Sequence, residues 1–511
     1  GGQNTGTSWV DAFIELRDAL EAVTRRPGPQ EIWVAKGAYR PAPFGGSRFA
    51  SFALIDGVAF YGGFGGVNSL DYPGGESDLQ QRRPRKNVTI LTGDLAGDDI
   101  GGLDDPSRAD NSYHVITARS VGLAAVLDGF RISGGNATAT NYPTRGGGLD
   151  LYQASPTIRD CRVVGNQASY GGGMCIALNS HPELIHCRFL QNRATTGGGG
   201  LSLGNTCHPT LLNCLFMGNA SLDGGGVRNY YRSNPTFINC VFSGNTATRY
   251  GGGLYSTTSS RPTLVNNTLA ANYAPTGGGI ANRTTTGLTL ANCVLWGNEN
   301  TDGSGQSAQL FEESVASPAA IDHTCIQGWT GSYGGIGNIS IPPLFVSVAG
   351  PDGLVGTEDD NLRLDDGSPC IDAGNTAQVP TDVTTDADGN LRVTLDAVDM
   401  GAYEYSLEGA VRLLQAFSRR THGAAGTFEI DLVHPVSGQT RPVEPRQGGP
   451  TQIVVTFSRP VFAAGDLDLS DVVLTASSGS AGVVTNLSVN DNNLVMDLAD
   501  TTDGTAVRVG F

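Results

Sequence analysis

The sequence predicts an all-β protein whose main part is a right-handed parallel β-helix, with a capping helix before it and a small β-sandwich after it. Three observations support this fold class. A glycine-rich pattern recurs between residues 144 and 298 at steps of about 26 residues, in several independent columns. The segments between the glycine runs are short and rich in strand-forming residues. The 72 glycines and 16% charged residues fit turn-rich β structure better than a helical protein.

Three columns of the repeat carry this interpretation. One coil cannot bury its apolar face alone, so coils must stack at the strand spacing of roughly 4.8 Å. Stacking predicts an internal asparagine ladder, in which each side-chain amide bonds main chain or the next amide. The cysteine column is interpreted as small, buried filler with free thiols, and parallel crossovers favour a right-handed coil. The columns are Leu149, Met174, Leu201, Val227, Leu254 and Ile280; Cys161, Cys187, Cys214, Cys240 and Cys293; and Asn166, Asn192, Asn219, Asn245, Asn272 and Asn298.

The first part of the chain, residues 1–115, is predicted to hold an N-terminal cap helix and the first irregular coils. Ser8 is the predicted N-cap of a helix from Trp9 to Arg25, whose apolar residues lie on one face. Because the end of a β-helix exposes an unpaired strand edge, we interpret this helix as its plug. Strands are expected over residues 31–38, 51–64, 88–95, 113–117 and 124–133, within or before the regular coils of residues 116–345.

The composition changes after the coils. Residues 346–405 are acidic and rich in turn residues, and we expect them to cap the C-terminal end of the β-helix. Residues 406–440 are interpreted as a connector. Residues 441–511 alternate as strands do and predict a small β-sandwich. Four or five strands are recognisable there, fewer than the about seven of a full sandwich, so we expect this domain to be incomplete.

Charge and cysteine content limit the classes of partner. A net charge of −17 argues against nucleic acid, because phosphate binding needs clusters of basic residues. No apolar run approaches the ~20 residues of a membrane-spanning helix. Neither an initiator methionine nor a signal peptide is present, so we treat the sequence as a mature chain or a fragment. Cys175 and Cys207 are candidates for a disulfide, and the states of Cys325 and Cys370 are left open.

Several segments carry a resemblance to known proteins. The stretch Leu127-Asp-Gly-Phe-Arg-Ile-Ser-Gly-Gly-Asn-Ala, the stretch Glu31-Ile-Trp-Val-Ala-Lys-Gly and the glycine triplets resemble secreted bacterial right-handed β-helix proteins with polymorphic outer-membrane-protein-like repeats. Residues 368–404 resemble a choice-of-anchor module, and residues 441–511 resemble Ig-like modules of large secreted proteins. The resemblance implies an Ig-like β-sandwich at the C-terminal end and a secreted, extracellular location, with attachment to the cell surface as a further expectation.

Tyrosines and arginines on the outward side of the coils are the candidate ligand-binding residues. Tyrosine rings stack on sugars and arginines form bidentate contacts with carboxylates, so these residues could bind an acidic or neutral glycan. The alternative is an ordinary solvated surface. The two nearby acids, Asp150 and Asp223, are three coils and roughly 14 Å apart, too far for the carboxylate pair of a hydrolase. The candidates are Tyr152, Arg228, Tyr230, Tyr255 and Arg283.

Two acidic loops are candidate sites for a structural calcium ion. Both offer oxygen ligands around a tight glycine turn, which suits Ca²⁺, although neither is a complete 12-residue EF-hand loop. Acidic turns without metal are the alternative. The candidate ligands are Asp386, Asp388 and Asn390 in one loop, and Asp352, Asp359 and Asp360 in the other.

These observations predict an extracellular or cell-surface structural or adhesive rod that presents a side face to a glycan or to another surface protein. Self-association through β-strand addition at the chain ends is a further expectation, and it would make the protein a subunit of a filament or surface assembly. The alternative is a polysaccharide lyase of the pectate-lyase-like β-helix type. No catalytic residue is identified, which favours the non-enzymatic interpretation.

Overall fold

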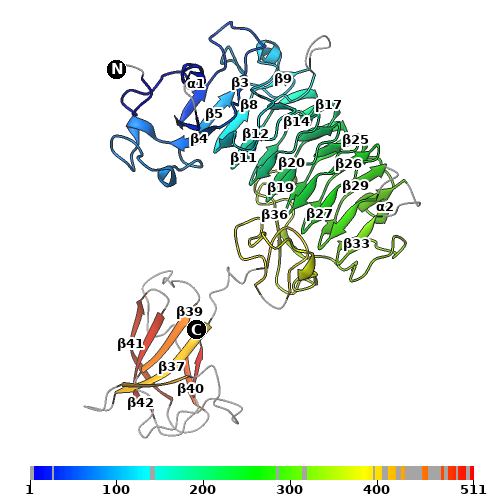
Figure 1. Cartoon of the computed structure of the whole chain (residues 1–511). Coiled ribbons are helices and arrows are strands. Elements are labelled where there is room, and N and C mark those ends of the chain that lie inside the picture. The colour runs from blue at the N-terminus through cyan, green and yellow to red at the C-terminus, as the bar shows by residue number, and fades with distance from the viewer. Residues whose placement is uncertain are drawn as a thin grey trace. The chain divides into compact units, whose positions relative to one another are not determined.

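The computed structural model divides the chain into two compact units, Gly1–Tyr405 and Ser406–Phe511 (Figure 1). Each unit is described by itself. The structure describes residues 5–25, 28–138, 144–283, 287–313, 319–394, 397–405, 413–421, 427–431, 452–457, 473–476, 481–490, 493–501 and 507–510.

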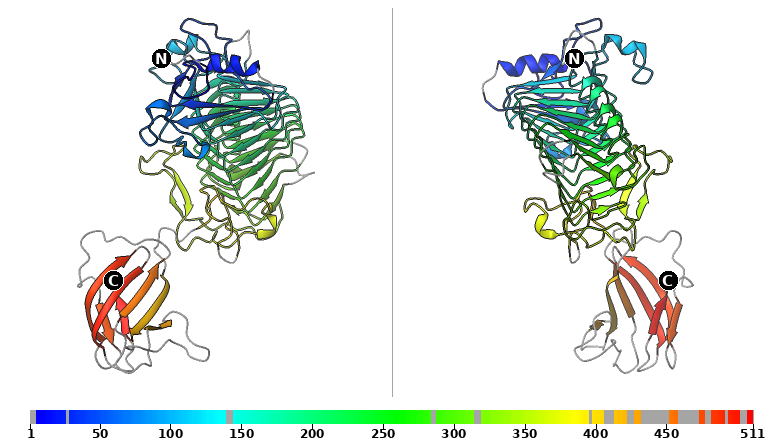
Figure 2. Two further views of the ribbon diagram at one scale, coloured as in Figure 1. Left: turned by 60° about the vertical axis from the view of Figure 1, so that its left-hand side comes forward. Right: turned by 90° about the vertical axis from the view of Figure 1, so that its right-hand side faces the viewer.

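The first unit is a β-helix of stacked parallel strands (Figures 1 and 2). Among the described residues the coils build three long parallel sheets, which we name A, B and C, and a five-stranded sheet D. Sheet A has the order β1 (Gln30–Ala35), β4 (Val58–Phe64), β7 (Val126–Asp128), β11 (Thr157–Arg159), β15 (Glu183–Ile185), β19 (Thr210–Leu212), β23 (Thr236–Ile238), β27 (Thr263–Val265), β30 (Thr289–Ala291) and β33 (Ala320–Asp322). Sheet B has the order β2 (Gly37–Tyr39), β5 (Thr89–Thr92), β8 (Phe130–Ser133), β12 (Arg162–Val164), β16 (Arg188–Leu190), β20 (Leu215–Met217), β24 (Val241–Ser243), β28 (Thr268–Ala270), β31 (Val294–Trp296) and β34 (Cys325–Ile326).

Sheets C and D lie on either side of the glycine runs. Sheet C has the order β3 (Phe52–Ala53), β6 (Ile116–Arg119), β10 (Leu149–Tyr152), β14 (Met174–Ala177), β18 (Leu201–Gly204), β22 (Val227–Asn229), β26 (Leu254–Thr257), β29 (Ile280–Arg283) and β32 (Leu310–Glu312). Sheet D has the order β25 (Thr246–Tyr250), β21 (Ala220–Asp223), β17 (Arg193–Gly197), β13 (Gln167–Tyr170) and β9 (Asn136–Ala137). Short helical segments are α2 (Gln306–Gln309), η1 (Gly66–Asn68), η2 (Leu79–Gln81), η3 (Pro106–Asp110) and η4 (Thr376–Gln378).

The predicted asparagine ladder is confirmed and runs through the core. Each Nδ2 from Asn166 to Asn272 donates to Oδ1 of the next asparagine at 2.8–3.1 Å. The same Oδ1 atoms also accept the main-chain N–H of the preceding asparagine. At the last coil Gln309 takes over, because its Oε1 accepts from Asn298 Nδ2 at 2.7 Å. The ladder therefore supplies partners for buried polar groups over six successive coils.

The glycine runs are required by the close approach of neighbouring coils. Gly224 has φ +64°, a conformation that favours glycine. A Cβ atom on the next residue, Gly225, would lie 2.4 Å from Thr246 O and 2.5 Å from Gly252 O. Main-chain oxygens cannot move away without breaking the parallel pairing. The run recurs in each coil because each coil stacks on the next in the same way.

Replacing Asn219 tests the ladder. Asn219→Ala removes a donor to Phe189 O and an acceptor for Asn192, and leaves these groups without their partners in the core. We expect the variant to lose at least about 2 kcal/mol of unfolding free energy, measured by urea denaturation. Asn68→Ala, at an exposed position in η1, is the matched control and should unfold like the wild type. Equal midpoints for both variants would contradict the importance of the ladder.

The N-terminal helix is shorter than predicted. α1 spans Leu16–Thr24, so the prediction of a helix from Trp9 to Arg25 with Ser8 as its N-cap is wrong. Instead, Ser8 Oγ accepts the N–H of Asp11 in a turn. The Trp9 indole donates to the main-chain oxygen of Glu76 at 2.7 Å. This long-range contact holds Trp9 outside the helix, and local helical periodicity gives no sign of it.

Helix α1 still covers the N-terminal end of the core. Leu16 and Ala19 are buried and belong to the same apolar cluster as Ile32 and Val34 of β1. At the other end Trp329 and Tyr333 pack against that cluster. The chain after β34 also pairs with the last coil, through a parallel bridge between Cys325 and Ile339. Side chains therefore cover the apolar core at both ends, although β1 is still the edge strand of sheet A among the described residues.

Residues 346–405 lie along the side of the β-helix rather than over its end, which corrects the prediction of a C-terminal cap. Leu362, Ala402 and Tyr403 pack against outward-facing apolar residues of sheet B, namely Leu190, Met217, Val241 and Ala270. Glu358 pairs with Arg162 and Arg188 on the same sheet. The antiparallel pair β35 (Phe345–Ser347) and β36 (Asn361–Leu364) belongs to this region. We name residues 346–405 the lateral module.

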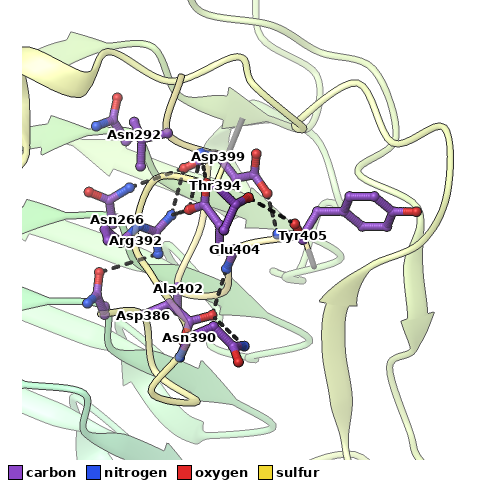
Figure 3. Close-up of polar contacts among 12 residues, drawn as sticks. Asn266, Asn292, Asp386, Asn390, Arg392, Thr394, Asp399, Ala402, Glu404 and Tyr405 are labelled. Carbon is purple, nitrogen blue, oxygen red and sulfur yellow. Dashed lines mark hydrogen bonds and ion pairs between the residues drawn. The ribbon is translucent and has the colours of Figure 1, made fainter. Parts of the chain in front are cut away.

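A buried ionic network fastens the lateral module (Figure 3). Arg392 is 1% exposed and forms an ion pair with Glu404 at 2.9 Å. The Nη1 atom of Arg392 donates to Asn239 Oδ1 on the β-helix at 3.5 Å. Asn266 Nδ2, also on the β-helix, donates to Asp399 O at 3.1 Å. Burial raises the pKa of Glu404 to about 8, against the opposing effect of Arg392. A charge placed this deeply needs its partner, because removing one member leaves the other unpaired.

The network makes a sharp prediction for Arg392. Arg392→Met keeps the bulk of the side chain but removes the cation beside Glu404, so at a pH above the Glu404 pKa of about 8 we expect a loss of about 3–5 kcal/mol. Limited proteolysis should then cut within residues 346–405 before it cuts the coils. The double variant Arg392→Met/Glu404→Gln replaces the carboxyl group by a neutral amide and should recover part of the loss in that same pH range. Proteolysis at the wild-type rate in the single variant would show that the network does not hold the module.

The described part of the second unit is antiparallel. One sheet has the order β38 (Thr427–Asp431), β37 (Leu413–Thr421), β39 (Gln452–Phe457), β42 (Asn493–Thr501) and β41 (Ala481–Asn490), and another pairs β40 (Val473–Ala476) with β43 (Val507–Gly510). Strands β37 and β38 fall in the predicted connector 406–440, and β37 pairs with β39. The extra β domain is thus larger than predicted, while its Ig-like character stays a prediction.

All nine cysteines are buried and free, so the prediction for the five ladder thiols is confirmed and a disulfide between Cys175 and Cys207 is wrong. Each ladder thiol lies near a main-chain oxygen, as Cys187 does to Ile158 O at 3.4 Å. Burial raises the pKa of Cys293 to about 12, which keeps that thiol protonated and unreactive. Among the described residues no helix is long and apolar enough to span a membrane.

Candidate functional site: a face of stacked arginines and tyrosines

The coil register gathers arginines and tyrosines along one side of the β-helix. Two columns meet there, because the glycine run turns the chain sharply from sheet D into sheet C. The first is formed by the second residues of the sheet C strands: Asp150, Cys175, Ser202, Arg228, Tyr255 and Ala281. The second lies just before the glycines: Arg145, Tyr170, Gly197, Asp223, Tyr250 and Thr276.

We call the surface formed by these columns and their neighbours the Arg–Tyr face. Its ten members are Arg119, Arg145, Tyr152, Tyr170, Arg228, Tyr230, Arg249, Tyr250, Tyr255 and Arg283. The five predicted ligand-binding residues all belong to it. The sequence gives weaker signals for Arg119, because this residue lies in an irregular coil whose register the repeat does not fix.

The second column covers the first more fully than strand alternation suggests. Asp150 is completely buried, and Tyr255 is only 7% exposed. Tyr250 stacks on Tyr255 with 5.5 Å between the ring centres. Tyr255 therefore supports the face from below, whereas Tyr152 and Arg228 are half-buried and keep an accessible side.

Guanidinium groups lie over the tyrosine rings from coil to coil. Arg145 lies 4.6 Å from the centre of the Tyr152 ring, and Arg283 lies 4.3 Å from that of Tyr250. Arg228 lies between two rings, 5.3 Å from Tyr170 and 4.4 Å from Tyr230. Such contacts attract through the ring quadrupole and hold both partners in place.

Arg228 differs from the other cations of the face in its charge balance. Arg119 and Arg145 both pair with Asp150, Arg249 pairs with Asp223, and Arg283 pairs with Glu313. In the part of the chain that the structure describes, no carboxylate lies within ion-pair distance of Arg228. Its Nε atom is buried without a hydrogen-bond partner. Arg228 is thus a positioned cation with unused donors.

Gly197 makes room for Arg228. A Cβ atom at residue 197 would lie 2.1 Å from Cδ of Arg228 and 2.9 Å from its Nε. The arginine of one coil therefore lies across the glycine of the coil before it. On the neighbouring coils this position holds Tyr170 and Asp223, so the gap occurs where Arg228 needs it.

The first predicted calcium loop is filled by its own hydrogen bonds. The Asp386 carboxylate accepts main-chain N–H groups of Asp388, Asn390 and Glu404 at 2.8–2.9 Å. Asp388 itself binds the Arg363 guanidinium through two contacts of 2.6 Å. These donors occupy the oxygens that a cation would need.

The second predicted loop is similar. Asp359 accepts from the Thr357 hydroxyl and from Asp352 N, and both bonds lower the pKa of Asp359. Asp360 accepts from Ser243 Oγ at 2.5 Å and thereby joins the lateral module to sheet B. A calcium ion at either loop stays a prediction.

Within the described residues, one group of three carboxylates lies close enough to share a metal ion, and it lies elsewhere. It consists of Asp94, Asp98 and Asp99. Asp94 accepts main-chain N–H groups of its own loop, and Asp99 pairs with Arg108 at 3.1 Å. These partners engage the carboxylates of Asp94 and Asp99.

Calcium dependence can be measured directly. N–H donors already bind the carboxylates of Asp386 and Asp359, so we expect the same melting temperature with EDTA and with CaCl₂. A concentration of about 1 mM of either is enough to reveal a weak calcium site. Differential scanning calorimetry of the whole chain gives the comparison. A lower melting temperature in EDTA would restore the calcium prediction.

Comparisons with known proteins agree on the fold. Residues 119–269 match the family model described as a right handed beta helix region. The main unit is a right-handed parallel β-helix. No curated protein matches the sequence significantly.

Two solved structures resemble the chain at low sequence identity. The pectate lyase Pel9A is 13% identical, with 80% of this chain and 94% of that chain covered and a TM-score of 0.40. The tailspike protein gp49 of the Acinetobacter baumannii bacteriophage Fri1, a capsular polysaccharide depolymerase, is 11% identical, with 96% and 80% covered and a TM-score of 0.33. With TM-scores below 0.5, these likenesses carry no conclusion about this chain.

Proposed function

We propose that the protein is an extracellular or cell-surface β-helix rod that binds an acidic glycan through the Arg–Tyr face. The observation that carries this proposal is Arg228, a cation held between Tyr170 and Tyr230 without an acidic partner among the described residues. A sugar carboxylate would supply the missing counter-charge through charge-assisted hydrogen bonds.

The neighbouring groups suit the rest of a sugar chain. Tyr152, Tyr170 and Tyr230 are half-buried and offer ring faces and hydroxyl groups. They lie along one side of a rigid, hydrogen-bonded solenoid, so binding would need little ordering of the protein. A glycan lying along the β-helix could contact several coils at once.

Polysaccharide lyase activity is the second candidate function. The same pair of groups favours it, because a lyase needs a cation to neutralise the uronate and a base to remove a proton, and Tyr170 lies beside Arg228. Binding and turnover are separate measurements. Ultraviolet absorbance of an unsaturated product, lost in Tyr170→Phe while binding persists, would favour the lyase.

Calorimetric titration with acidic and neutral polysaccharides tests the binding proposal. We expect polygalacturonate or alginate to bind more tightly than dextran. Arg228→Ala should weaken the uronate affinity by about tenfold or more, since it removes a charge-assisted contact. Gly197→Ala should weaken it as well, because the added methyl group displaces Arg228.

Arg131→Ala is the matched control. Arg131 is exposed on sheet B, away from the Arg–Tyr face, and its loss changes the net charge by the same amount. If Arg131→Ala and Arg228→Ala weaken binding equally, the polysaccharide responds only to the net charge of the protein, and the proposed site is wrong. Absence of binding to any uronate would reject the proposal itself.

A further inference from the structure

Strand β1 leaves one edge of sheet A without a neighbouring strand. It pairs in parallel with β4, from Gln30 opposite Val58 to Trp33 opposite Tyr61. It is the outermost strand of its sheet among the described residues. An unpaired strand edge presents a row of main-chain donors and acceptors, which is a template for another strand.

A cavity of about 810 Å³ lies along this edge. Every residue from Gln30 to Lys36 lines it, including Ile32 and Trp33, which point to opposite sides of the strand. Seven consecutive lining residues mean that the cavity follows the edge of the strand, not one of its faces. Phe13 and Leu16 line the opposite wall, on and before α1. The space is therefore a slot between a helix and a strand edge.

The opposite end of the β-helix shows what closes such an edge. There the chain after β34 returns, and Ile339 forms a parallel bridge with Cys325. The main-chain N–H of His323 also donates to Ile336 O at 2.8 Å. The chain thus adds main-chain pairing of its own at that end, through an isolated bridge to β34 of sheet B. At the N-terminal end the described residues leave an open slot beside β1 of sheet A.

We propose that this slot binds an extended peptide, which adds to sheet A as a strand parallel to β1. Strand addition satisfies the main-chain groups of β1 and continues the solenoid by one strand. The length of β1, six residues, sets the length of the bound segment. This interaction is separate from glycan binding, because the slot lies at the N-terminal end of the β-helix and the Arg–Tyr face lies along its side.

The walls of the slot specify the chemistry of the peptide. Ile32 and Val34 are buried and belong to the core, so the bound segment must carry an aliphatic residue where it extends their column. The charged lining residues are Glu15, Glu31, Glu76 and Lys36, three acids and one base. Such a slot favours a peptide with a basic residue. Trp9 and Trp33 also line the slot, and their rings fit an alkyl stem of arginine or lysine.

A blocked hexapeptide that copies residues 261–266 of this chain (Arg-Pro-Thr-Leu-Val-Asn) is a suitable probe. It contains the sequence of β27, which already packs in sheet A, and it carries an arginine and no tryptophan. Hydrogen exchange of the β1 amides, read by mass spectrometry, should slow by at least about tenfold when the peptide is bound. Trp9 and Trp33 line the slot, so tryptophan fluorescence should report the same saturation.

Two controls make the result specific. Ala22 lines the slot from α1, so Ala22→Phe should fill the space and abolish both signals while circular dichroism shows a folded chain. Asp18→Ala changes an exposed position of α1 that does not line the slot, and it should bind the peptide as the wild type does. The all-D form of the peptide cannot match the strand geometry and should give no saturation.

The proposal is overturned by any of three results. One is unchanged exchange of the β1 amides at millimolar peptide. Another is equal protection by the all-D peptide, and the third is undiminished binding in Ala22→Phe. The glycan titrations are independent of all three, so failure of strand addition leaves the proposed function untouched.

Discussion

The asparagine ladder is the interaction on which the rest of this structure depends. Every rung fixes the distance and the register between two coils, since each side-chain oxygen accepts both an amide and a main-chain N–H of the coil before it, as Asn245 does from Asn219. A coil with one residue too many would still close, but its asparagine would lose these partners in a dry core. The cost of an unsatisfied buried amide therefore keeps the repeat regular. Once the register is fixed, each surface position becomes a column that runs along the β-helix.

Columns convert scattered surface residues into a continuous face. Tyr170 and Arg228 are far apart in the sequence, yet the register places them 5.3 Å apart. The acidic residues of the same face neutralise most of its arginines, and Arg228 is the exception among the described residues. Gly197 has no side chain, and this allows the aliphatic part of Arg228 to lie across the preceding coil. Recognition would thus depend on the irregular positions of an otherwise regular scaffold.

Features that depend on the repeat period can be predicted from the sequence. Features that depend on contacts between distant segments cannot. The ladder, the buried cysteines and the Arg–Tyr columns follow from one repeated step, so residues such as Asn219 and Arg228 could be assigned before the structure. The start of α1 could not, because Trp9 is held by Glu76 in a distant loop. The burial of Tyr255 depends on which side chain of the neighbouring column lies over it. The sequence also does not show which N–H groups reach Asp386, and calcium at the acidic loops stays a prediction.

The position of the lateral module could have been predicted from the apolar residues on the outward side of sheet B. A solvated sheet should show polar residues at its outward positions, yet sheet B carries Leu190, Met217 and Val241 there, and all three are buried under the module. Sheet C carries Asp150, Arg228 and Tyr255 at its corresponding positions, beside small residues. The polarity of an outward column therefore decides whether it is buried. An apolar column has to be covered by another part of the chain, whereas a charged and aromatic column can stay exposed to a ligand. Because the module covers sheet B and the Arg–Tyr face lies over sheets C and D, glycan binding would not have to displace the contacts of Arg392 that hold the module in place.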